Sequence, residues 1–155
     1  MRNFSRLTIF AAVLLSGCAK NELPLFDEPF TYVETSTGST VAIVGADMKA
    51  TVTYYIGISC PAFTEPFDVQ YDISWGSGLQ EGVDFDILSS DRFVTFRPGI
   101  WRMPVRIQWK EHAIDESKDN SVSITLTGTS SGNFTLGYPG PASKGRILTI
   151  TKKNL

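Results

Sequence analysis

The fold class is decided by the stretch Phe67-Asp68-Val69-Gln70-Tyr71-Asp72-Ile73-Ser74-Trp75. Large apolar residues occupy every second position of this stretch, and polar residues fill the positions between them. A period of two is typical of a β-strand that has one face against a hydrophobic core and the other face in water. The stretch therefore predicts a half-buried strand over 67–75, and its apolar face needs a second layer to cover it.

The same alternation recurs along most of the chain. It predicts longer strands over 51–60, 101–109 and 122–127, and shorter strands over 31–34, 41–44, 93–96 and 145–151. The gaps between these segments are rich in Gly, Pro and Ser, as at 76–78, 98–99, 130–132 and 138–141, and no window shows a helical stripe. The pattern predicts an all-β fold, an antiparallel immunoglobulin-like β-sandwich of about seven or eight strands.

Composition excludes several classes of protein. The chain has 155 residues, of which 42% are hydrophobic, so it is not disordered. A formal charge of −2 provides no basic surface for a phosphate backbone, so we expect no nucleic-acid partner. One His and two Cys leave little material for nucleophile–base pairs or zinc sites, and we expect no enzymatic activity.

The N-terminus has the features of an export signal. Arg2 and Arg6 are followed by the apolar stretch 7–15, which is too short to span a bilayer. The next residues, Leu15-Ser16-Gly17-Cys18, resemble the signal of bacterial lipoproteins, in which processing leaves the cysteine as the acylated N-terminus. The alternative is an ordinary signal peptide with a chance cysteine.

This resemblance implies the organisation and location of the chain. Residues 1–17 would be the signal peptide, 18–29 the lipidated Cys18 with its tether, and 30–155 the folded domain. Acyl chains on Cys18 would make the membrane a partner and hold the protein in the bacterial cell envelope, with the outer membrane as the expected location.

Several motifs in the predicted sandwich resemble one family. They are Gly82-Val83-Asp84-Phe85, Val94-Thr95-Phe96-Arg97-Pro98-Gly99, the strand 103–109 with the acidic loop after it, the strand 122–127, and Ile147-Leu148-Thr149-Ile150. In this order they resemble the Calx-beta domain, over about residues 30–151. The chain also looks like small Calx-beta-like lipoproteins encoded beside outer-membrane glycan-uptake systems. The resemblance implies a seven-stranded sandwich.

The best-known Calx-beta domains bind calcium in loops at one end, and this sequence departs from them there. The family has an acidic triplet at each of two positions. In this sequence those positions are occupied by Lys110-Glu111-His112 and Lys152-Lys153-Asn154. Calcium needs six to eight oxygen ligands, so cations at these positions disfavour a site, and we expect no cofactor. A degenerate calcium site would use Glu34, Asp115, Glu116 and Asp119, and the alternative is a solvated acidic loop.

Three polar residues invite a catalytic interpretation that we do not favour. Asp84 and Asp86 could act as an acid–base pair in a glycosidase, but nothing in the sequence places two carboxylates across a cleft. Asp84, at a corner between strands, is expected to accept hydrogen bonds from the backbone. His112 has no second His beside it and is expected to be an exposed loop residue.

Aromatic residues that occupy the polar positions of an alternating strand, or that lie in loops, suggest ligand binding. Trp101, Tyr55 and Tyr138 are the candidates, because a flat ring with a polar edge stacks well on a sugar or on a partner surface. We therefore expect a non-catalytic binding module, with glycans as the leading ligand class. The alternatives are an adhesin or a scaffold for an outer-membrane protein, paired through an exposed sheet edge, and a hydrolase with displaced carboxylates.

Overall fold

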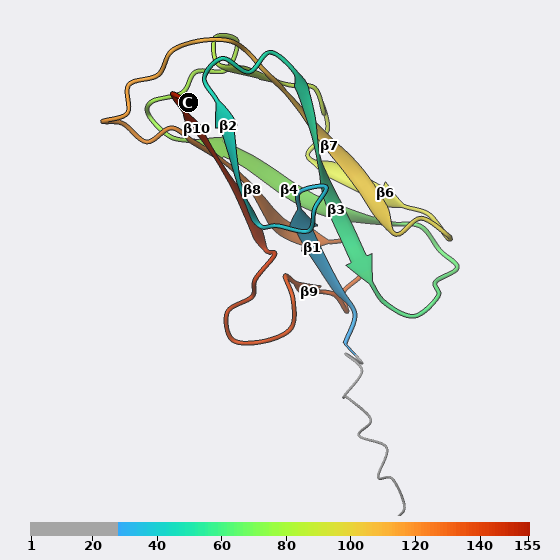
Figure 1. Cartoon of the computed structure of the whole chain (residues 1–155). Helices are drawn as coiled ribbons and strands as arrows, with labels where there is room; N and C mark the ends of the chain where they lie inside the picture. Colours follow the sequence, from blue (N-terminus) through green and yellow to red (C-terminus); the bar gives the residue numbers. More distant parts are fainter. Residues whose placement is uncertain (1–27) are drawn as a thin grey trace, which may run out of the picture.

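A computed structural model describes residues 28–155, and these residues form two five-stranded sheets packed face to face (Figure 1). The predicted signal peptide, Cys18 and most of the predicted tether lie outside the described residues. Within 28–155 there is no helix that is long and apolar enough to cross a bilayer. The all-β sandwich predicted from the alternating pattern is confirmed.

The first sheet, sheet A, has the strand order β5-β7-β3-β1-β9. Its strands are β5 (Phe85–Ile87), β7 (Arg102–Trp109), β3 (Thr51–Ser59), β1 (Phe30–Glu34) and β9 (Thr135–Leu136). The second sheet, sheet B, has the order β2-β10-β8-β4-β6. Its strands are β2 (Val41–Gly45), β10 (Ile147–Lys153), β8 (Ser121–Thr129), β4 (Phe67–Trp75) and β6 (Phe93–Phe96).

Strand pairing defines two ends of the sandwich. At the entry end, where β1 begins, Phe30 pairs with Ser59, and this end carries the loops 60–66 and 97–101. At the far end lie the loops 46–50, 76–84 and 110–120, which bond to one another through their backbones. Figure 1 shows β3 running from the far end, at the top, towards the entry end.

The eight predicted strands are all present and most pairings are antiparallel as predicted, but the structure has more strands than the seven or eight expected. The structure has ten strands, and two pairings, β1 with β9 and β2 with β10, are parallel. The two additional strands, β5 and β9, have three and two residues. Strands this short contain too few residues to show an alternating pattern in the sequence.

The core fills the space between the sheets with the apolar phase of each strand. Trp109 and Tyr54 are its largest fully buried side chains, and the indole Nε1 of Trp109 donates a hydrogen bond to the Tyr54 hydroxyl at 3.2 Å. Burial raises the pKa of Tyr54 to about 12, although this hydrogen bond acts in the opposite direction. The ring therefore stays neutral throughout the physiological range.

A buried ion pair links the two sheets at the far end. Lys152 of β10 is only 1% exposed, and its ammonium donates to Asp84 Oδ1 at 3.0 Å and to the Lys110 carbonyl at 2.9 Å. The other carboxylate oxygen of Asp84 accepts a hydrogen bond from the backbone N–H of Gln80 at 2.9 Å. The prediction that Asp84 accepts hydrogen bonds from the backbone is therefore confirmed, although the ion pair was not foreseen.

His112 also contacts this carboxylate, with its Nδ1 2.9 Å from Asp84 Oδ1. About half of the His112 side chain remains exposed, as expected for a loop residue. Burial by itself would raise the pKa of Asp84, but the hydrogen bonds from Gln80, His112 and Lys152 outweigh it, so the pKa lies below its ordinary value. The carboxylate is therefore charged at neutral pH.

We expect Asp84→Asn to destabilise the fold by about 3–5 kcal/mol, because it leaves the buried Lys152 ammonium without a counter-charge. The measurement is urea unfolding. The control is Asp86→Asn, because the Asp86–Lys110 pair is about one-third exposed on both sides and its loss should cost no more than about 1 kcal/mol. Because the pKa of Asp84 is lowered, the difference in the free energy of unfolding between the variant and wild type should be largest at neutral pH. This difference should shrink as the pH falls through that pKa. Equal effects of the two substitutions would contradict this account.

Candidate functional site

Three tyrosines and an ion pair form a continuous surface on the outer face of sheet A, which we call the tyrosine platform. Its members are Tyr32, Glu34, Tyr55, Arg102 and Tyr138. The strand residues among them lie on the phase opposite to the buried residues of β1, β3 and β7, so the alternation that fills the core also directs them outward. Tyr138 follows β9 and reaches the same face.

A glycine on β3 makes room for the first tyrosine. Tyr32 of β1 pairs with Gly57 of β3, and a Cβ atom on Gly57 would lie 2.5 Å from Cζ of Tyr32. The absent side chain lets the Tyr32 ring lie across the neighbouring strand. Tyr138 stacks on Tyr32 with a centroid distance of 5.1 Å and an interplanar angle of 19°, and both rings contact Phe30.

Arg102 connects the tyrosines to an acidic group. Its guanidinium forms an ion pair with Glu34 at 2.9 Å, donates to the Thr35 carbonyl at 3.0 Å, and lies 4.0 Å from the centroid of the Tyr55 ring. These three contacts hold the planar guanidinium in one orientation while part of it stays exposed. The platform therefore offers aromatic rings and fixed hydrogen-bonding groups side by side.

The charges of the platform act on its tyrosines. Burial raises the pKa of Tyr32 and Tyr138, the negative charge of Glu34 raises both further, and the positive charge of Arg102 lowers both. The Tyr138 hydroxyl is 3.5 Å from Glu34 Oε2, at the limit of a hydrogen bond. Both hydroxyls therefore remain protonated donors at neutral pH.

The structure brings together only part of the predicted ligand site. Tyr55 and Tyr138 both lie on the platform, but Trp101 does not belong to it. The Trp101 ring lies at the entry end, edge-on to Phe63 at 5.6 Å, and Phe63 contacts Phe67 at 5.1 Å. These rings close the entry end of the core.

Tyr32 and Arg102 were missed by the sequence analysis, and Glu34 was assigned to a metal site instead. The signal available in the sequence was the alternation Phe30-Thr31-Tyr32-Val33-Glu34, in which the outer phase carries two rings and a carboxylate. The partner strand that completes the site could not be identified from this pattern.

The predicted metal ligands do not come together. Glu34 is paired with Arg102, whereas the Asp115 carboxylate accepts hydrogen bonds from the N–H and hydroxyl of Ser117. These two bonds lower the pKa of Asp115. Within 28–155 no three His, Cys, Asp or Glu side chains form a group that could hold a metal ion.

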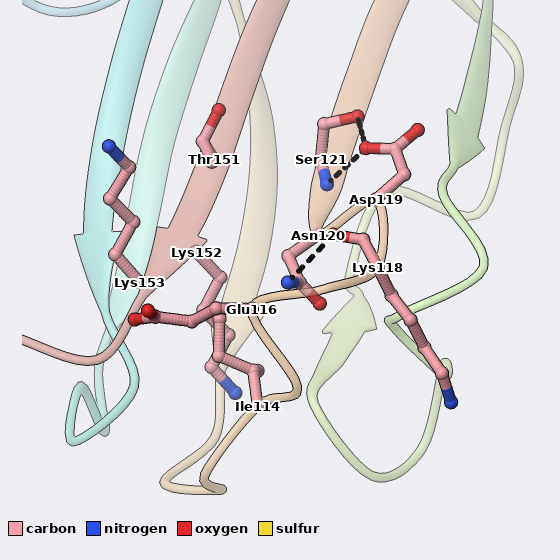
Figure 2. Close-up of a pocket in the computed structure, with 9 residues that line it drawn as sticks. All are labelled: Ile114, Glu116, Lys118, Asp119, Asn120, Ser121, Thr151, Lys152 and Lys153. Carbon is pink, nitrogen blue, oxygen red and sulfur yellow. Dashed lines mark hydrogen bonds between the residues drawn. The ribbon is translucent and has the colours of Figure 1, made fainter.

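Glu116 and Asp119 line a cavity of about 380 Å³ at the far end, shown in Figure 2. Its other lining residues are Ile114, Lys118, Asn120, Ser121, Thr151, Lys152 and Lys153. The Asp119 carboxylate accepts hydrogen bonds from the N–H and hydroxyl of Ser121, at 3.1 and 2.7 Å (Figure 2). Lysines and carboxylates both line this cavity, so their opposite charges weaken its attraction for either a cation or an anion.

Asn120, which lines this cavity, carries a buried polar atom without a hydrogen-bond partner among the described residues. Asn120 donates from Nδ2 to the carbonyls of Asp115 and Lys118, but its buried Oδ1 accepts no hydrogen bond among the described residues. A Cβ atom on Gly78 would come within 2.1 Å of this oxygen. Asn120 Oδ1 therefore faces the backbone of the loop 76–84.

Comparison with protein-family models finds no match for this chain, and comparison with curated proteins finds no significant match either.

We expect Glu34→Gln to lower the pKa of Tyr32 and Tyr138, and Arg102→Met to raise it, because the two charges act on these rings in opposite directions. The measurement is NMR titration of chain labelled at tyrosine Cζ. Tyr54 provides the internal control, because it is buried in the core and its pKa of about 12 should change in neither variant. A shift of the same sign in both variants would contradict the geometry of the platform.

Proposed function

We propose that this chain is a lipid-anchored protein of the bacterial cell envelope, attached to the outer membrane through Cys18. Its Calx-beta-like sandwich would be a non-catalytic module that binds glycans. The observation that carries the glycan proposal is the tyrosine platform, in which three rings surround the Arg102–Glu34 ion pair. The anchor proposal depends on the sequence Leu15-Ser16-Gly17-Cys18.

The chemistry of the platform suits a sugar. A pyranose has an apolar face of C–H groups, which packs on an aromatic ring, and a rim of hydroxyls, which both donate and accept hydrogen bonds. Arg102 supplies donors and Glu34 supplies acceptors at the edge of the Tyr55 ring. Because the ion pair already fixes both side chains, binding would cost little side-chain entropy.

A metal is not needed for this function. The Lys152 ammonium already supplies a positive charge to Asp84 at the far end, where a Calx-beta domain with bound calcium would carry carboxylates. We therefore propose that the module works without a cofactor, and that a degenerate calcium site is the weaker alternative.

A second candidate function is that of a scaffold for an outer-membrane protein. It is favoured by β2, an edge strand of sheet B that exposes Val41 and Ile43 to 67% and 59%. Apolar side chains on an unpaired edge favour the addition of a partner strand. Binding of a partner here would leave the tyrosine platform free.

The anchor is tested by the substitution Cys18→Ser in cells that process lipoproteins. We expect this variant to lose both the incorporated fatty acid and its place in the membrane fraction, because the acylated sulfur is removed. Cys60→Ser is the matched control, since Cys60 is half-buried and burial raises the pKa of its thiol. Fatty-acid labelling that survives in Cys18→Ser would refute the anchor.

The glycan site is tested by titrating the mature chain with a glycan panel, in calcium and in chelator, using calorimetry. We expect binding that is independent of calcium, and we expect Tyr55→Ala and Tyr138→Ala to weaken it about tenfold each, about 1.4 kcal/mol. The control is Phe93→Ala, which removes an exposed ring from sheet B. Equal losses in all three variants would contradict the site, and no binding to any glycan would favour the scaffold.

A further inference from the structure

The entry end of the sandwich carries an exposed apolar tip. The turn between β6 and β7 is closed by a hydrogen bond from the Ile100 N–H to the Arg97 carbonyl at 2.9 Å, and Gly99 has a φ of 86°. Only glycine adopts this φ readily, as the third position of a type II turn requires. The turn leaves Ile100 and Trp101 exposed to 43% and 42%.

The charges around the tip are of both signs. Arg97 forms no ion pair among the described residues, and Asp91 lines a shallow pocket together with Arg97 and Ile100. Glu65 lies in the nearby loop 60–66, and Arg102 follows Trp101. Trp101 packs edge-on against Phe63 of that loop, so the ring is held in place although two-fifths of it is exposed. A fixed indole with an apolar neighbour and a cation beside it is the combination that is enriched at membrane–water interfaces.

The length of chain before β1 limits where the entry end can lie. Cys18 precedes Glu28 by ten residues, and ten extended residues reach at most about 35 Å. The nine-residue strand β3 spans about 30 Å between the two ends of the sandwich. Because the tether joins the domain at the entry end, that end lies within about 35 Å of a bilayer that holds Cys18, whereas the far end can lie a full strand length further away.

From these observations we propose that Ile100 and Trp101 form a membrane contact, in which the tip of the β6–β7 turn inserts among lipid headgroups. The inference rests on the proposed function, because it needs an anchor at Cys18. The contact orients the domain with its strands pointing away from the bilayer, and it keeps the far end in water. Lipid, and not a protein, is the occupant of the tip.

The chain provides a matched pair of tryptophans for the test. Trp75 is 41% exposed and follows β4 to the far end, so it has the same exposure as Trp101 at the opposite end of the sandwich. Trp109 is fully buried, so its fluorescence contributes the same background emission in every sample. Trp75→Phe therefore leaves Trp101 as the one accessible indole of the described residues, and Trp101→Phe leaves Trp75.

The experiment places each variant of the lipidated chain in vesicles of phosphatidylethanolamine and phosphatidylglycerol with a spin-labelled headgroup as quencher. We expect strong loss of emission in Trp75→Phe and little loss in Trp101→Phe. Aqueous acrylamide without vesicles should quench the two variants alike. Equal quenching by the headgroup label, stronger quenching of Trp75, or no quenching of either would each overturn the proposal.

Failure of the anchor is kept separate from failure of the contact. If Cys18 carries no fatty acid in cells, the chain beginning at Cys18 is coupled through its thiol to a maleimide lipid, with Cys60→Ser to prevent a second attachment. The quenching comparison then tests the tip by itself. Loss of the anchor is thus detected as missing fatty acid on Cys18, and failure of the tip is detected separately as missing or unselective quenching of Trp101.

Discussion

The buried ion pair between Lys152 and Asp84 is the constraint on which the far end depends. An ammonium inside the sandwich is stable only if a carboxylate and further acceptors meet it, because its hydration is lost. Asp84 can meet it only where the loop 76–84 reaches the end of β10, and the Lys110 carbonyl must arrive from the end of β7. Three segments from both sheets are thus fixed relative to one another by one charge.

The tyrosine platform depends on the same kind of cross-strand constraint, now on the surface. The register that buries Val33 and Ile56 in the core places Glu34 opposite Tyr55 and Tyr32 opposite Gly57 on the outer face. A shift of one residue would exchange the two faces and lose core and platform together. The stability of the fold and the geometry of the candidate site therefore depend on a single pairing of β1 with β3.

The sequence predicted what depends on local periodicity and missed what depends on pairing. The strand over 67–75 was predicted with its observed bounds, because its apolar phase is unbroken. Tyr55 and Tyr138 were identified as outward-facing rings, but Arg102 was not, because nothing local shows that β7 lies beside β3. Trp101 was grouped with those tyrosines, whereas tertiary packing places it against Phe63 at the entry end.

The side chain of Lys152 lies in the core because β10 is longer than predicted. The strand was predicted to end at 151, which placed Lys152 after it, at a position where the Calx-beta family carries an acidic residue, but β10 continues to Lys153. Lys152 then has the inward phase of Leu148 and Ile150, and its charge enters the core. The same cation that disfavoured a metal in the sequence is therefore the structural element that closes the far end. The proposed contacts with a glycan and with lipid lie on other surfaces, the outer face of sheet A and the entry end.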